Sequence, residues 1–209
     1  MVEAEGEVRR TLPDTSVLYP ISVLDLLMRL AENGIHDIVW SDDLLDELEE
    51  KWREGRAQGK RVPGEVGGAS ALAGIRRTFA ATHVLREEYE ASIAEMPGSD
   101  EDDKPHRAAA LAGSATHIIT SDRAGGFPRR ELAELGIVVQ RPDTYLADLA
   151  QEYPDDCRRI VHEMVQRRRR KEPHFTINDL LQRWRSGVGR GSFCTQLELR
   201  ANVARGSRH

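Results

Sequence analysis

The chain has few cysteines, few aromatic residues and no long apolar segment. Two of its 209 residues are cysteine, Cys157 and Cys194, and they provide neither a disulfide framework nor a zinc-binding pattern. This scarcity favours a reducing compartment such as the cytoplasm. No apolar run approaches the length of about 18 residues that a membrane-spanning helix needs. The acidic N-terminus "MVEAEGEVRR" lacks the apolar segment of a secretory signal, so we expect a cytoplasmic protein that does not enter a membrane.

Charge is distributed unevenly along the chain. The net charge is −5 overall, yet residues 154–209 contain 13 Lys and Arg against 6 Asp and Glu, and the remainder contains 17 against 29. An acidic body with a basic tail suggests that the tail attracts phosphate groups. The alternative is that these basic residues form a solvated helix face.

Short apolar runs alternate with helical patterns through most of the chain. We predict strands at 8–13, 36–40, 82–85, 117–121 and 137–140, and helices at 20–34, 42–54, 69–80, 86–96, 104–115, 129–136 and 143–150. This alternation predicts an α/β fold with a mostly parallel sheet covered by helices on both faces. Beyond residue 154 only helices are predicted, at about 155–170, 176–185 and 193–204.

Carboxylates adjoin these predicted elements at four places. Asp14 follows the first strand, Asp122 follows "HIITS", Asp103 precedes the small-residue helix 104–115, and Glu47 lies beside the apolar stripe of helix 42–54. Ligands of a parallel sheet bind at the carboxyl ends of its strands. Carboxylates that converge there repel each other unless a cation is present. Oxygen ligands without paired Cys or His indicate Mg²⁺ or Mn²⁺, which suits phosphodiester cleavage.

Each acid also has an ordinary structural interpretation. Asp14 and Asp122 are also typical of turns, and Glu47 is also typical of a charged surface helix. Asp103 is also typical of a helix N-cap within the acidic stretch "SDEDD", where Asp100 or Asp102 could take the same role. The joint placement of the four acids, more than any one of them, indicates a metal site.

Four motifs resemble a known family. "DTSVLYP", "WSDDLLDEL", "DDKPHRAAALAGSATHIITSD" and "GIVVQRPDTYLADL" occur in that order within residues 8–152. Together they resemble the PIN-domain ribonucleases found as VapC-like toxins in bacterial type II toxin–antitoxin systems. The resemblance implies a PIN-like three-layer α/β fold over residues 8–152, with a central, mostly parallel sheet and an acidic pocket for Mg²⁺ or Mn²⁺. It implies that the catalytic and metal-binding acids are Asp14, Glu47, Asp103 and Asp122, and that Ser16 and Thr120 orient them.

The chain departs from the family pattern at three places. The first strand is polar and ends in Pro13, which predicts an irregular sheet edge. Lys104-Pro105 follows the third acid where the family has Arg-His, and His106 comes one residue later. The family's additional Asp before Phe-Pro is missing from "RAGGFP", which predicts weaker metal affinity. We interpret the other notable side chains as structural: Thr15 in a turn, His106 and His117 as non-ligands, and Trp40, Trp52 and Trp184 in packing.

Residues 153–209 are predicted to form a basic, all-α C-terminal extension, as in some PIN proteins. Its candidate RNA-binding residues are Arg167, Arg168, Arg169, Arg170 and Lys171, and the alternative is a solvated helix end. The resemblance further implies RNA as substrate, a small antitoxin protein as partner, and a homodimer.

Two functional hypotheses from different classes follow. The first is a metal-dependent endoribonuclease, the toxin of a toxin–antitoxin pair. The second is a PIN-like protein with weak or no catalysis that binds RNA or a protein partner, as the missing acid near Gly126 suggests. A small-molecule phosphohydrolase ranks lower, because such aspartyl-phosphate enzymes typically begin with Asp-x-Asp and Ser16 stands two residues after Asp14.

Overall fold

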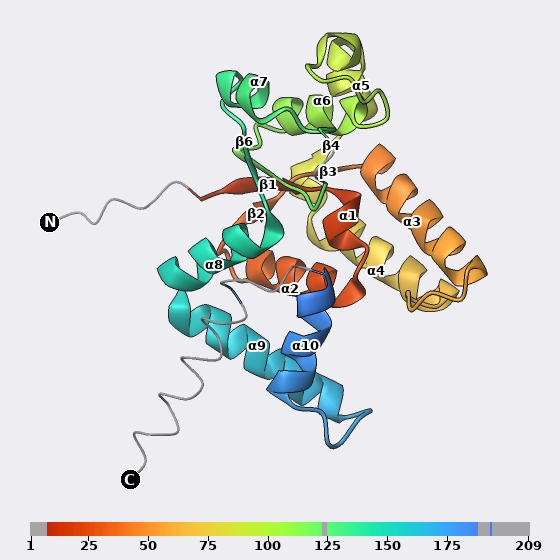
Figure 1. Cartoon of the computed structure of the whole chain (residues 1–209), viewed down its shortest axis with the longest axis vertical. Helices are drawn as coiled ribbons and strands as arrows, with labels where there is room; N and C mark the ends of the chain where they lie inside the picture. The colour runs from red at the N-terminus through yellow and green to blue at the C-terminus, as the bar shows by residue number, and fades with distance from the viewer. Residues whose placement is uncertain (1–7, 123–124, 188–192, 194–209) are drawn as a thin grey trace, which may run out of the picture.

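The computed structural model describes residues 8–122, 125–187 and 193 (Figure 1). Its strands are β1 (Arg10–Pro13), β2 (Asp37–Ile38), β3 (Trp40–Ser41), β4 (His83–Val84), β5 (His117–Ile119) and β6 (Val138–Gln140). Its α-helices are α1 (Thr15–Leu18), α2 (Ile21–Glu32), α3 (Asp42–Ala57), α4 (Glu65–Thr78), α5 (Arg86–Tyr89), α6 (Lys104–Ala112), α7 (Arg129–Glu134), α8 (Pro142–Glu152), α9 (Pro154–Arg169) and α10 (Ile177–Gly187). Two 3₁₀ segments, η1 (Ala80–Thr82) and η2 (Glu90–Glu95), replace parts of the predicted helices.

The central sheet has four parallel strands in the order β2-β1-β5-β6. After β1 the chain adds β2 on one side and later returns to add β5 on the other side. The carboxyl ends of β1 and β5 therefore flank the point where the strand order reverses, which is where α/β proteins bind ligands. The predicted strand near 82–85 is β4, which pairs with β3 in a separate two-stranded sheet.

The polar sequence of the first strand predicted an irregular sheet edge, and this prediction is wrong. β1 lies in the interior of the sheet, where Thr11 and Leu12 are fully buried. Pro13 is the last residue of the strand and has no backbone N–H to donate. The next residue, Asp14, donates its amide to the Ile119 carbonyl (2.9 Å). Proline is tolerated here because it ends the strand and does not interrupt it.

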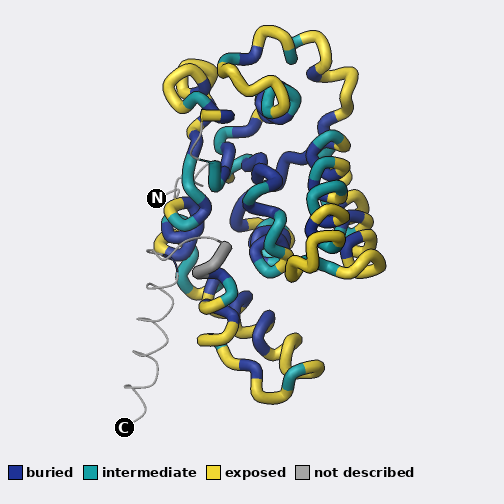
Figure 2. The backbone as a smooth tube through the Cα atoms, turned by 45° about the vertical axis from the view of Figure 1, so that its right-hand side comes forward, coloured by how far each residue is buried: buried dark blue, intermediate teal, exposed yellow. Residues whose placement is uncertain are grey.

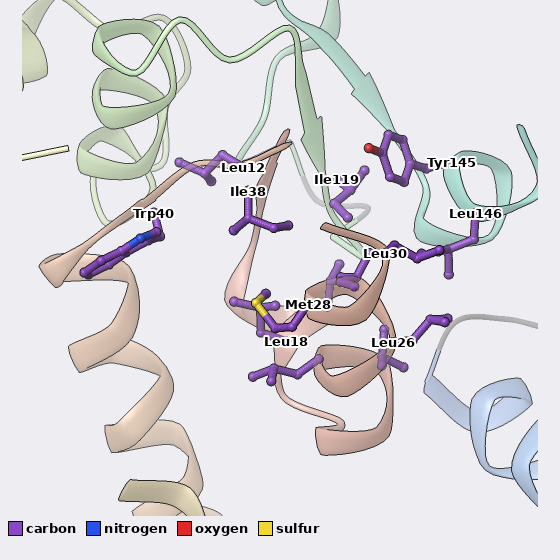
Figure 3. Packing of buried hydrophobic residues seen from close by; sticks show 14 of the residues in the cluster. Leu12, Leu18, Leu26, Met28, Leu30, Ile38, Trp40, Ile119, Tyr145 and Leu146 are labelled. Carbon is purple, nitrogen blue, oxygen red and sulfur yellow. The ribbon is translucent and has the colours of Figure 1, made fainter. Parts of the chain in front are cut away.

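Helices cover both faces of the sheet, as predicted. α6 and α7 lie on one side, and α2, α8 and α9 lie on the other (Figure 1). The buried core is aliphatic for the most part and centres on strand residues such as Leu12, Ile38 and Ile119 (Figure 3). On α6 the alanines 108–110 are fully buried, so this helix approaches its neighbours closely. Trp40, Trp52 and Trp184 are buried, which confirms their predicted packing roles.

A hydrogen-bonded chain crosses the core beside β1. The Thr11 hydroxyl lies 2.7 Å from the Tyr145 hydroxyl, which lies 2.8 Å from His36 Nδ1. Burial lowers the pKa of His36 to about 4, so this core histidine is neutral near pH 7. Its Nε2 lies 3.0 Å from the Leu27 carbonyl and must donate to it, which leaves Nδ1 to accept from the Tyr145 hydroxyl.

The C-terminal helices pack onto the α/β body. α9 contacts α2 and α8, and α10 contacts α2 and α9. Trp184 is fully buried, and its indole N–H donates to the Ser22 carbonyl of α2 (3.1 Å). Figure 2 shows buried residues continuing from the body into these helices. The helix predicted at 193–204 lies outside the described residues, apart from Phe193. None of the described helices is both long and apolar enough to span a membrane.

Candidate carboxylate site

Asp14 stands at the carboxyl end of β1 and is 5% exposed. Its Oδ2 accepts hydrogen bonds from the hydroxyls of Ser16 and Thr120, the second at 2.8 Å. Ser16 Oγ also accepts a hydrogen bond from the Ser121 amide (3.1 Å), which ties α1 to the segment after β5. Both hydroxyls predicted to orient the acids therefore contact the first of them.

Asp122 comes three residues after β5, and the same threonine links it to Asp14. The Thr120 hydroxyl donates to Asp14 and accepts from the Asp122 amide (2.9 Å). The Asp122 Oδ2 accepts from the Gly126 amide (3.1 Å). The acids that follow two neighbouring strands, Asp14 and Asp122, are therefore connected through the Thr120 hydroxyl.

Asp103 occupies the N-cap position of α6, but it makes no side-chain hydrogen bond to the described amides of that helix. Its carboxylate faces Asp122 across Gly126, because a Cβ built at Gly126 would overlap Asp103 Oδ2 and lie 3.1 Å from Asp122 Oδ2. Burial and then the charges of Asp14 and Asp100 raise the pKa of Asp103 to about 6. Asp102 is exposed, so Asp103 is the residue of this acidic stretch that joins the site.

Glu47 projects from α3 toward the same region, but other side chains of the protein already bind it. Its carboxylate contacts the Lys51 ammonium at 2.5 Å, and it also accepts a hydrogen bond from His106 Nε2. Burial alone would raise the pKa of Glu47, but these bonds outweigh it and lower the pKa to about 2. Glu47 is therefore a firmly ionised carboxylate with a cationic neighbour.

Thr15 connects Glu47 to the aspartates. Its fully buried hydroxyl donates to Glu47 Oε1 (3.0 Å) and accepts from Lys51 Nζ (2.7 Å), while it lies next to Asp14 in sequence. The charges of Asp14 and Asp103 help to raise the pKa of Lys51, although burial opposes the rise and the contact with Glu47 contributes more. The four predicted acids therefore belong to one connected site.

Sequence reasoning missed three side chains of this site. Thr15, interpreted as a turn residue, bonds to Glu47, and His106, interpreted as structural, also contacts it. Lys51 lies four residues after Glu47, a spacing on a helix that is a recognised signal for an ion pair. No sequence signal identifies His106, because its contact with Glu47 depends on how α3 and α6 pack. His117 bonds to Thr116 and packs against Tyr145 with the two rings tilted, outside the acidic site.

The basic residues of the extension lie away from these acids. Arg167, Arg168, Arg169, Arg170 and Lys171 are exposed and occupy the end of α9 and the turn toward α10. Figure 1 shows this turn at the far end of the molecule from α6. Arg168 pairs with Glu172 (2.6 Å), and Arg169 donates to the Phe175 carbonyl (2.8 Å). These residues do not line the acidic site.

The donor set matches a hard divalent cation in its chemistry. Asp14, Asp103 and Asp122 offer carboxylate oxygens, as Mg²⁺ and Mn²⁺ prefer. Burial and the repulsion from Asp14 and Asp100 raise the pKa of Asp103, and a bound cation would relieve that repulsion. Within residues 8–122, 125–187 and 193, no three His, Cys, Asp or Glu side chains form a group that could hold a metal ion. These residues therefore match Mg²⁺ or Mn²⁺ in the type of donor atom and in charge.

Neither a protein-family model, nor a curated protein, nor a solved structure matches the chain. The fold and the site define an α/β protein with a parallel four-stranded sheet and acids at its strand ends. The resemblance to the PIN-domain ribonucleases stays a prediction from the four motifs.

Proposed function

We propose that this protein is a Mg²⁺- or Mn²⁺-dependent endoribonuclease. One observation carries the proposal: the Asp103 and Asp122 carboxylates approach each other at Gly126, and Asp14 is joined to the Asp122 amide through Thr120 where the order of the parallel strands reverses. Carboxylates placed this close together repel each other, so their placement favours a cation-dependent role. The order of the four motifs along the chain supports RNA as the substrate.

Each residue of the site has a distinct role in this proposal. Asp14, Asp103 and Asp122 would hold the cation, and the hydroxyls of Ser16 and Thr120 fix the rotamer of Asp14. A bound Mg²⁺ or Mn²⁺ would activate a water molecule and neutralise charge on the phosphodiester. Glu47 stays ionised through His106 and Lys51 and orients the Thr15 hydroxyl beside Asp14.

The location, partners and RNA-binding residues of the protein are also part of the proposal. We infer a cytoplasmic toxin that pairs with a small antitoxin protein, and a homodimer as its own assembly. The exposed basic residues 167–171 would contact RNA phosphates remote from the scissile bond, because they lie away from the acids. Their loss would then weaken RNA binding and reduce its salt dependence without abolishing cleavage.

Cleavage of labelled RNA with Mn²⁺ and with EDTA tests the proposal. We expect cleavage with Mn²⁺, none with EDTA, and a loss of at least about 100-fold in Asp14→Asn, because a metal-binding acid is removed. The matched control is Asp102→Asn, which removes an exposed acid one residue before Asp103 and leaves activity unchanged. If pure wild-type protein cleaves RNA with neither Mg²⁺ nor Mn²⁺, the ribonuclease proposal is rejected. Turnover of a generic phosphomonoester would support a phosphohydrolase instead.

A second candidate is a PIN-like binding protein without catalysis. It is favoured by one observation, that the Lys51 ammonium already lies 2.5 Å from Glu47 and adds positive charge beside the aspartates. Such a protein would bind RNA with equal affinity in Mn²⁺ and EDTA and would cleave in neither. Fluorescence anisotropy with labelled RNA, run beside the cleavage assay, separates the two candidates.

A further inference from the structure

Arg107 is a fully buried arginine on α6, one helical turn after Asp103. Burying a charge is costly unless strong hydrogen bonds compensate it, and an apolar residue of similar size usually serves stability as well. Arg107 uses its guanidinium to bind two backbone carbonyls. Nη1 donates to the Gly126 carbonyl, Nη2 donates to the Asp100 carbonyl (2.7 Å), and Nε has no partner within the described part of the chain.

Both carbonyls belong to segments that carry site acids. Gly126 binds Arg107 through its carbonyl and Asp122 through its amide, so the guanidinium and the Asp122 carboxylate are connected through the backbone of one residue. The Asp100 carbonyl lies in the turn that leads to Asp103. The charge of Asp103 also attracts the guanidinium. One buried side chain therefore connects the backbone supports of two carboxylates from different parts of the sequence.

Gly126 is needed for space and not for backbone freedom. Its φ lies outside the left-handed region, where glycine is favoured, whereas Gly125 next to it has a φ of 100°. A Cβ at Gly126 would overlap Asp103 Oδ2, lie 3.0 Å from Asp103 Cγ, and lie 3.1 Å from Asp122 Oδ2. The absent side chain lets the two carboxylates approach each other.

We infer that Arg107 and Gly126 form a carboxylate clamp, which sets the spacing between Asp103 and Asp122 for cation binding. Arg107 is a positioning residue in this arrangement, since it acts through the Gly126 backbone and through the turn that contains the Asp100 carbonyl. The inference rests on the proposed function, because it assigns the clamp to the same site. In this inference Gly126, which lies near the place where the family pattern has an additional acid, allows Asp103 and Asp122 to approach each other.

Binding of Mn²⁺ alone to the full chain, measured by calorimetry, tests the clamp. We expect Gly126→Ala and Arg107→Met to weaken Mn²⁺ binding by roughly 10- to 100-fold, as loss of residues that support metal ligands typically does. Arg107→Lys keeps the charge and one carbonyl bond, so it should recover part of the affinity. RNA cleavage by Arg107→Lys should return toward the wild-type rate at saturating Mn²⁺, which a general loss of folding would not produce.

Matched controls separate the clamp from nonspecific damage. Gly74→Ala places a methyl group in α4, where no described atom other than the neighbouring backbone of the same helix lies within 4 Å, and Arg130→Met removes an exposed arginine of α7. Both should keep wild-type Mn²⁺ affinity. If Arg107→Met fails to fold, the Mn²⁺ affinities of Arg107→Lys and Gly126→Ala test the clamp. Wild-type affinity in a folded Gly126→Ala variant would overturn the clamp while leaving the metal site in place. Failure of wild-type protein to bind Mn²⁺ would overturn both.

Discussion

The Lys51 ammonium lies 2.5 Å from the Glu47 carboxylate, close enough to Asp14 and Asp103 for their charges to act on it. Because the charges of Asp14 and Asp103 also attract the Lys51 ammonium, it acts as a counter-cation within the site. A divalent ion would enter a region that the protein has already partly neutralised. This pairing leads to the first prediction.

Lys51→Met should strengthen Mn²⁺ binding. Removing one positive charge near the cation changes the interaction energy by about 1 kcal/mol, or roughly fivefold in affinity, at the effective dielectric of a half-exposed site. The gain should shrink as salt is added. Calorimetry of Lys51→Met against Arg53→Met, an exposed neighbour on α3, measures it. Weaker Mn²⁺ binding in Lys51→Met alone would show that Lys51 supports the ligands instead of opposing the ion.

Asp103→Asn should stabilise the protein in EDTA and remove its stabilisation by Mn²⁺. Burial and the charges of Asp14 and Asp100 disfavour the ionised carboxylate, so a neutral amide relieves repulsion of about 1 kcal/mol after solvent screening is allowed for. Thermal unfolding at pH 7.5 should show a melting temperature a few degrees higher in EDTA. Asp102→Asn is the control. A lower melting temperature for Asp103→Asn in EDTA would mean that the carboxylate makes a stabilising contact.

Acid should destabilise the fold through His36. Its folded pKa is about 4, below its unfolded value near 6.5, so the unfolded chain binds more protons between these values. The contribution is fully present above about pH 6.5 and is lost as the pH falls toward 4, by up to about 3 kcal/mol.

His36→Gln cannot titrate and should flatten this pH dependence. Urea unfolding at pH 7, 6, 5 and 4.5 measures the difference in free energy of unfolding between wild type and variant, which cancels the contribution of the carboxylates. His162→Gln, which alters an exposed histidine on α9, should keep the wild-type slope. Parallel curves for wild type and His36→Gln would contradict the assignment.

Trp184→Ala should destabilise the whole chain and not the extension alone. Trp184 is fully buried against α2, so its loss should cost about 3–5 kcal/mol. If residues 153–209 share a cooperative unit with the body, urea unfolding followed by fluorescence and by circular dichroism should give one coincident transition at a lower midpoint. Gln182→Ala, an exposed neighbour, is the control. Two separate transitions would identify an independent domain.

The strand and helix pattern was accessible from the sequence, and most elements lie near their predicted positions. Periodicity failed at residues 86–96, where α5 gives way to the 3₁₀ segment η2. It also misjudged β1, whose polar residues and Pro13 suggested an edge, because strand order depends on long-range pairing that local composition does not encode. The single turn α1 at 15–18 was too short to give a periodic signal.

The sequence by itself determined the α/β alternation and the four acids, because both depend on residue type and spacing. Only the tertiary structure decided how the acids are held. It joined Asp14 and Asp122 through Thr120, paired Glu47 with His106 from a distant helix, and placed the Arg107 guanidinium on the Gly126 carbonyl. These contacts connect residues far apart in the chain, and their energies depend on burial and on angstrom-scale distances that only packing sets.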